Sequence, residues 1–411
     1  MRSPLHHEIR SVFADGALRP IAAALFLHGL SQGMTIPLLA LWIAAAYHGG
    51  APATAAYFGC AALGGLLLNP WLGRLADAWG RPRLTAAIAA GLQAAGLVAL
   101  ALRLPFPLVL VVAACLMASQ MQPHLFTLAD GHIRGGEARR GRALTVATLR
   151  SMISAAWIVG APLGGLLAAR GYTALFLLAA GMNLAAIACT LAFCRDRTGL
   201  APTPGAAPPG VPAAPPRGPQ LLLFGLAVAL ITAGNAAKMQ AVPLYLAHLG
   251  WSPALVGAAF GWMALAEMLL MPPVGRLADR VSRRQVIALG SLGGVVFFGA
   301  IGLVPGPLAV VLAFPAISFL IAALYGVGIG YAQDLDPEHP GLAGGTFFAA
   351  QGVGSAAGGP LIAVSTAAYG LPGGFLLPAL AVLVGGCGVL LTRPVRDAPL
   401  AAPALAVGAG D

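Results

Sequence analysis

The chain has 411 residues, of which 59% are hydrophobic and only 9% are charged, and its formal net charge is +10. Soluble domains usually carry about 25% charged residues, so this composition excludes an ordinary soluble protein and predicts an integral membrane protein. A membrane-spanning helix needs about 20 predominantly apolar residues, and apolar runs of that kind recur along the chain.

We predict an all-α membrane protein with twelve transmembrane helices in two bundles of six. The N-terminal bundle covers residues 20–194 and the C-terminal bundle covers residues 220–392, and a proline-rich cytoplasmic linker over 195–219 joins them. Residues 1–19 form a cytoplasmic lead without a cleavable signal peptide, and residues 393–411 form a cytoplasmic tail. The predicted spans are residues 20–46, 52–72, 84–102, 105–130, 143–169, 172–194, 220–248, 253–274, 285–304, 307–333, 341–368 and 372–392.

The distribution of arginine and lysine predicts the orientation of the chain. With both termini in the cytoplasm, the cytoplasmic segments hold 19 of the 23 basic residues, whereas the external loops hold only Arg103 and Arg170. Cytoplasmic loops of membrane proteins carry such an excess of basic residues. We therefore expect a protein of the bacterial inner membrane that contacts lipid, and we do not expect nucleic acid as a partner.

In the N-terminal half, three predicted spans carry polar residues on one helical face, at spacings of three and four residues. The members of these stripes include Gln32 in the first span, Gln120 in the fourth, and Arg150 and Trp157 in the fifth. Arg150 lies well inside its helix, where a charge is costly unless it is paired or hydrated. The stripes are therefore expected to face protein or water rather than lipid.

In the C-terminal half, Asn235 and Lys238 share a face of the seventh predicted span, and Gln351 lies in the eleventh. Lys238 is the only lysine of the chain, so its deep position is not a product of surface composition. Glu267, in the eighth span, is the only carboxylate predicted to lie far from either membrane face. Ionisable residues at such depth indicate a functional site.

Polar stripes thus occupy predicted spans 1, 4, 5, 7, 8 and 11, whereas spans 3, 6, 9 and 12 are comparatively bare. We expect the bare spans on the outside, against lipid. We expect spans 1, 4, 5, 7, 8, 10 and 11 to surround a central polar cavity between the two halves. Such an arrangement predicts a pathway for a small solute.

A five-residue motif occurs twice, each time at the end of an apolar span. Gly-Arg-Leu-Ala-Asp fills residues 73–77 and again residues 275–279, and Asp130 recurs as Asp334. The repeats indicate two related halves, which is a common organisation of transporters. Because glycine tolerates positive φ, we expect Gly73 and Gly80 to permit a tight turn after the first copy.

The repeated motif, with Gly80 and Arg81 after the first copy, resembles the loop signature of the major facilitator superfamily. The resemblance implies two six-helix bundles related by a pseudo-two-fold axis. It also implies that the aspartates of the two motifs cap helices of the partner bundle in one conformation, while nearby arginines pair with Asp130 and Asp334. The chain departs from the family pattern at Ala78, where a basic residue is common. The residues expected to gate transport are Gly73, Asp77, Arg81, Asp130, Gly275, Asp279, Arg283 and Asp334.

Within the superfamily, the chain resembles the bacterial sugar efflux transporters. The resemblance lies in residues 122–129, 149–162, 235–244, 266–267 and 332–335. Lys238 is not typical of that group, so the substrate of the group is carried over to this chain less directly at this position. The residues that fit positions of the group are Arg150, Trp157, Asn235, Glu267 and Gln333.

These features favour a secondary active transporter that exports small sugars or glycosides by alternating access, in antiport with protons. Glu267 is the expected proton carrier because it is the only deep carboxylate. Efflux of drugs or other amphipathic small molecules is the main alternative, because the polar stripes alone do not distinguish the two substrate classes. A non-transporting membrane sensor is a more remote alternative. The expected substrate-binding residues are Gln32, Gln120, Arg150, Trp157, Asn235, Lys238 and Gln351.

The sequence lacks a nucleotide-binding loop, a metal-ligand cluster and a nucleophile–base pair, so we expect neither an enzyme nor a bound cofactor or metal. The five cysteines lie in or at the ends of predicted spans, and we interpret them as buried packing residues. We expect the protein to be a monomer.

Overall fold

The computed structural model describes residues 15–47, 50–118, 121–134, 142–194, 218–304, 306–337 and 339–393. These residues form thirteen helices and no strand. The helices before residue 195 are α2 (Leu18–Tyr47), α3 (Gly50–Trp79), α4 (Pro82–Ala101), α5 (Phe106–Ala118), α6 (Gln122–Arg134), α7 (Arg142–Arg170) and α8 (Tyr172–Phe193). The helices after residue 217 are α9 (Pro219–His248), α10 (Pro253–Arg280), α11 (Arg283–Leu303), α12 (Pro307–Leu335), α13 (Pro340–Gly373) and α14 (Leu376–Leu391).

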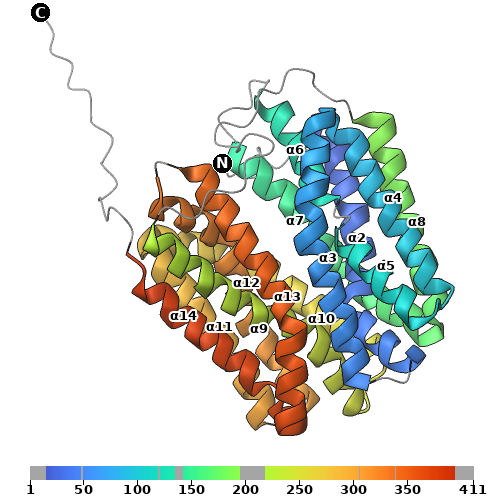
Figure 1. Ribbon diagram of the computed structural model, residues 1–411, viewed down its shortest axis with the longest axis vertical. Coiled ribbons are helices and arrows are strands. Elements are labelled where there is room, and N and C mark those ends of the chain that lie inside the picture. The colour runs from blue at the N-terminus through green and yellow to red at the C-terminus, as the bar shows by residue number, and fades with distance from the viewer. Residues whose placement is uncertain are drawn as a thin grey trace, which may run out of the picture.

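The helices lie in two groups, α2–α8 on one side of the molecule and α9–α14 on the other (Figure 1). In the first group α2 packs against α7 and α8, and in the second group α9 packs against α13 and α14. The two groups meet where α7 packs against α10 and where α3 packs against α13.

The fold class predicted from the sequence, an all-α membrane protein, is confirmed. Nine helices of the described chain are long and apolar enough to cross a membrane. Three shorter apolar helices, Pro52–Leu67, Phe106–Leu116 and Leu376–Leu391, lie at the places of predicted spans 2, 4 and 12. The count of twelve transmembrane helices stays a prediction.

The predicted fourth span, residues 105–130, is not one uninterrupted helix. That span consists of α5 and α6, and residue 121 forms a bend immediately before α6. Pro123 is the second residue of α6. Proline lacks an N–H group and is tolerated in the first turn of a helix, where no carbonyl of the same helix would accept that hydrogen bond. The position of Pro123 therefore agrees with a new helix that begins at Gln122.

The expectation that Gly73 forms part of a turn is also wrong. The first Gly-Arg-Leu-Ala-Asp copy lies inside α3, and the second lies inside α10. The turn comes only at Gly80, where φ is +58°. In the second half the equivalent position is Ser282, whose hydroxyl accepts a hydrogen bond from the Gln285 N–H in a capping box. The two halves thus reverse direction at the same place, one with a glycine and the other with a helix cap.

Helices α4, α8, α11 and α14 lie on the two outer flanks of the molecule (Figure 1). They expose many large apolar side chains, as a surface in contact with lipid requires. The expectation that predicted spans 3, 6, 9 and 12 lie outside is therefore confirmed. The exposed residues of these helices include Leu84, Leu92, Leu177, Leu184, Leu191, Leu292, Val296, Leu380 and Leu391.

Candidate functional site

Close contact between the two groups of helices is made by glycines of α7 and α10. A Cβ atom at Gly257 of α10 would overlap the carbonyl oxygen of Ala161, and one at Gly165 of α7 would come within 2.5 Å of the Pro253 oxygen. Both contacts lie near the C-terminal end of α7, just before Tyr172, and near the N-terminal end of α10, just after Trp251. We call this the closed end, and we call the end that holds Gly80 and Ser282 the motif end. Small residues allow the backbones to approach this closely.

Arg150 of α7 extends from the first group of helices to the second. Its guanidinium carbon lies 5.7 Å from the centre of the Tyr325 ring on α12, within the range of a cation–π contact. The Asn235 side chain of α9 also lies beside Tyr325. The Arg150 side chain is exposed rather than buried in the packed core. Three helices from both groups thus bring a cation, a phenol and an amide to one place.

Lys238 and Glu267 bring two opposite charges to the same region. Lys238 is 0% exposed, and its ammonium lies 3.4 Å from the sulfur of Met263 on α10. Glu267 lies one helical turn further along α10, on the same face as Met263, and its carboxylate is attracted by both Lys238 and Arg150. A thioether cannot balance the charge of an ammonium, so Glu267 supplies the negative charge that a buried lysine requires.

Several buried polar atoms on α9 and α13 lack a hydrogen-bond partner among the described residues. They include Oδ1 of Asn235 and Oε1 of Gln240 on α9, and Nε2 of Gln351 on α13. Helices α9 and α13 lie against each other, because Gly354 approaches Thr232 and Gly358 approaches Ala236. A buried polar group without a partner costs about 1–3 kcal/mol, so a ligand that supplies the missing hydrogen bonds would be favoured here.

The first group of helices has its own buried polar network. His28 and Ser31 of α2 bond to Asn183 of α8, with a 2.9 Å contact to the histidine Nδ1 and a 2.8 Å bond to the serine hydroxyl. Gln122 of α6 donates a 2.7 Å hydrogen bond to Gln32. Gln32 also lines a cavity of about 50 Å³, which is far smaller than the several hundred Å³ of typical ligand sites.

The structure brings together Arg150, Asn235, Lys238 and Glu267 from the set expected at the site. It places Gln32 in the separate network of the first group. Trp157 packs its backbone against Gly33 of α2, where a Cβ would lie 3.0 Å from the tryptophan Cα. Gln120 lies outside the described residues.

The expected gating residues are described only in part. Arg283 donates two hydrogen bonds, of 2.9 and 2.8 Å, to the two carboxylate oxygens of Asp334, and both side chains are half exposed. This pairing agrees with what the family resemblance implies. Arg81 is exposed just after the turn at Gly80. Gly275 lies inside α10. The side chains of Asp77, Asp130 and Asp279 are outside the described set.

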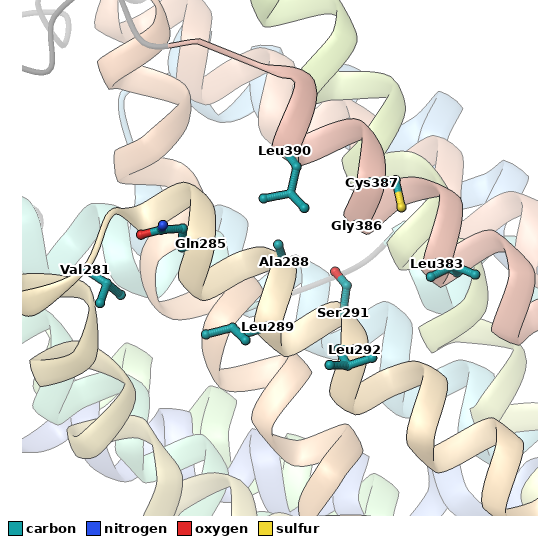
Figure 2. Close-up of a pocket in the computed structure, with 10 residues that line it drawn as sticks. All are labelled: Val281, Gln285, Ala288, Leu289, Ser291, Leu292, Leu383, Gly386, Cys387 and Leu390. Atoms are coloured by element: carbon teal, nitrogen blue, oxygen red, sulfur yellow. The ribbon is translucent and has the colours of Figure 1, made fainter.

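A further cavity lies apart from this site. It is a groove of about 490 Å³ between α11 and α14, on an outer flank of the molecule (Figure 2). Its lining is almost entirely apolar. Cys387 lines the groove and is exposed, as is Cys115 on α5, so the interpretation of all cysteines as buried is wrong for these two. They lie on helices whose outer faces carry no further helix to cover them.

Sequence reasoning missed Tyr325 as the partner of Arg150 and Met263 as the partner of Lys238. Tyr325 is separated from Arg150 by 175 positions in the chain, and no local spacing links the two. Met263 could have been found, because it lies four residues before Glu267 and therefore on the same helical face. No group of three histidine, cysteine or acidic residues that could hold a metal ion occurs among the residues searched.

Comparison with known proteins shows what the chain is similar to. The sequence model of the Major Facilitator Superfamily matches residues 21–245 and 224–408. Sugar efflux transporter A of Dickeya chrysanthemi is 28% identical over 281 residues, which are 68% of this chain and 70% of that protein. Sugar efflux transporter C of Escherichia coli K12 is 26% identical over 328 residues, or 77% of this chain and 81% of the relative. The crystal structure of the nucleoside transporter NupG superimposes on this chain with a TM-score of 0.76 at 15% sequence identity. The superposition covers 90% of this chain and 97% of NupG, so the two proteins share the fold.

Proposed function

Because the chain belongs to the major facilitator superfamily, it is a membrane transporter rather than an enzyme, and we propose that it exports small sugars or glycosides across a bacterial inner membrane. In this proposal both termini are cytoplasmic, so the motif end faces the cytoplasm. The names of its sugar efflux relatives support the substrate class. Their identity to this chain is low, so the residues of the site carry the rest of the proposal.

The observation that carries the proposal is a set of buried polar atoms on α9 and α13 that lack hydrogen-bond partners among the described residues. Oδ1 of Asn235 is an acceptor without a donor, and Nε2 of Gln351 is a donor without an acceptor. A sugar hydroxyl both donates and accepts hydrogen bonds, so a ring with several hydroxyls can satisfy groups of both kinds. Arg150 and Tyr325 add a charged donor and an aromatic face. Dispersed polar partners of this kind suit a sugar better than an apolar drug.

We propose that transport proceeds by alternating access between the two groups of helices. The glycine contacts between α7 and α10 close one end in the conformation described. The Arg283–Asp334 pair lies at the motif end, where both side chains are about 45% exposed. An exposed ion pair of this kind contributes about 0–1 kcal/mol, so rearranging it between two conformations costs little. The pair is therefore suited to a gate and not to a permanent clamp.

We propose that protons drive export by antiport, with Glu267 as the carrier. The carboxylate lies within the attraction of two cations, Lys238 and Arg150, which come from different groups of helices. When the groups move relative to each other, the distance from Arg150 to Glu267 changes, while Lys238 and Glu267 stay within one group. Proton affinity at Glu267 would then differ between the two conformations, which is the condition for coupling transport to a proton gradient.

Uptake into inside-out proteoliposomes tests the substrate class. A panel of labelled monosaccharides, disaccharides and glycosides would be offered with and without an imposed pH gradient, next to an amphipathic fluorescent dye. We expect at least one sugar to accumulate, faster when the vesicle lumen is acidic. Accumulation of the dye without any sugar would instead indicate multidrug efflux. Sugar movement that does not respond to the gradient would remove proton coupling from the proposal.

A further inference from the structure

The groove between α11 and α14 has the shape of a site for one long apolar chain. Helix α11 lines it from Gln285 to Leu292 and α14 from Leu383 to Leu390, about two turns of each helix (Figure 2). Ala288 of α11 and Gly386 of α14 are the two smallest residues of the lining. The helices touch at Ser291, where a Cβ on Gly386 would come within 2.6 Å of the serine Cβ.

The lining and the position of the groove indicate that lipid is the molecule it meets. Leu289 and Leu292 on one wall and Leu383 and Leu390 on the other are each between 44% and 54% exposed. These helices form an outer flank of a protein that crosses a membrane. An acyl chain that enters the groove would bury this apolar area.

Positive charge gathers at the motif end of the groove. Val281 and Gln285 line that end, and Arg280 stands directly before Val281, exposed on the last residue of α10. Arg284 donates a 2.8 Å hydrogen bond to the carbonyl oxygen of Thr392, just beyond α14. The bond holds the start of α11 against the end of α14.

Arg393 follows Thr392 directly and is exposed. Its backbone N–H donates to Gln220 of α9 at 2.8 Å, which fixes the chain three residues after Leu390 of the groove lining. Arginines from α10 and from the segment after α14 thus flank one opening. Clusters of basic residues at the membrane surface attract anionic headgroups.

We propose that this groove binds one acyl chain of an anionic phospholipid, with the headgroup phosphate held by Arg280 and Arg393. Arg284 positions the two walls through its bond to Thr392. The lipid would occupy the gap between α11 and α14 and would stay bound when the bulk lipid around the protein exchanges.

The matching flank of the other group is packed differently. Arg83 donates a 3.1 Å hydrogen bond to the carbonyl oxygen of Cys194 after α8, as Arg284 does after α14. Between α4 and α8, however, the side chain of Ile187 packs onto Gly91, with its Cδ1 3.8 Å from the Cβ position there. Ile187 thus fills the space over Gly91 between these two helices.

Alkylation of Cys387 tests the proposal, because this exposed cysteine lines the groove. The purified protein would be placed in nanodiscs of phosphatidylcholine, or of phosphatidylcholine mixed with phosphatidylglycerol of identical acyl chains, and treated with a maleimide. Peptide mass spectrometry would give the alkylation rates of Cys387 and of Cys115, an exposed cysteine on α5, from one sample. The second cysteine reports any general effect of the anionic surface on thiol reactivity.

We expect phosphatidylglycerol to slow alkylation of Cys387 relative to Cys115 by about fivefold for each arginine engaged. Arg280→Gln with Arg393→Gln should abolish this difference, whereas Arg170→Gln, at the closed end of α7, should keep it. Ala288→Phe, which fills the groove, should also abolish it. The proposal is wrong if both cysteines respond equally to the two lipids, or if the protection of Cys387 survives removal of the two arginines. Either result would mean that the groove holds only bulk lipid.

Discussion

Lys238→Met tests whether Lys238 and Glu267 act as an electrostatic pair inside the transporter. Methionine keeps an unbranched side chain of similar length and removes the charge, and it can pack against Met263, whose sulfur already lies 3.4 Å from the ammonium. Since Lys238 is 0% exposed, bulk water cannot take over its role toward Glu267. The attraction between the two charges should therefore appear as a coupling free energy of unfolding.

The separation of the two charges sets the size of this coupling. Two unit charges 4 Å apart attract by about 4 kcal/mol at an effective dielectric constant near 20. Lys238 and Glu267 are not among the direct ion pairs of the described residues, and Arg150 also attracts the carboxylate. Both facts reduce the coupling, and we expect about 2 kcal/mol.

A double-mutant cycle measures the coupling. The free energy of unfolding would be determined by titration with sodium dodecyl sulfate in mixed micelles, for Lys238→Met, for Glu267→Gln and for the double variant. The double variant should be more stable than the sum of the single effects implies. As a control, Lys238→Met combined with Asp334→Asn should be additive within about 0.5 kcal/mol, because that aspartate pairs with its own arginine. Equal additivity in both cycles would refute the electrostatic pair.

Three further variants test the helix contacts and the gate. Gly257→Ala should lower the free energy of unfolding by about 1–3 kcal/mol and slow transport, because a Cβ there meets backbone atoms of α7. Gly299→Ala is the control and should change neither quantity, because nothing lies within 4 Å of the added atom. Arg284→Gln should cost about 1.5–3 kcal/mol in the same unfolding titration, because it removes the charged donor to the carbonyl of Thr392; an unchanged free energy would mean that this bond is not formed. Asp334→Asn should change stability by less than about 1 kcal/mol but alter the rate of sugar exchange, and a wild-type exchange rate would argue against a role in gating.

The course of the helices could be predicted from the sequence because the membrane imposes a minimum length on each apolar run. The predicted span 220–248 differs from α9 by one residue at its start. The break in the helix at residue 121 was not predicted, although Gln120, Gln122 and Pro123 interrupt the apolar run there. The sequence analysis also missed that both copies of the Gly-Arg-Leu-Ala-Asp motif are helical. Polar residues show where a helix leaves the apolar part of the membrane, but the helix can continue beyond that point.

The site itself could be predicted only as a set of deep polar residues. Lys238 and Glu267 were found because charge is costly inside a membrane, which makes each of them conspicuous in an apolar run. Their contacts with Met263 and Arg150 depend on how α7, α9 and α10 pack, and this packing is not encoded in the spacing of any one helix. The groove between α11 and α14 was not predicted, because spans bare of polar residues carry no sequence signal for a gap between them.

Export by the Glu267→Gln variant is the most direct test of the claim that this transporter couples sugar export to protons. The substitution keeps the shape of the side chain and removes the group that titrates. Inside-out proteoliposomes would be loaded with unlabelled sugar to measure exchange without a driving force, and a parallel sample would receive a pH gradient. The account predicts that the variant exchanges labelled sugar at a rate near that of the wild type but loses acceleration by the gradient. Full acceleration of export by the pH gradient in Glu267→Gln would contradict the account.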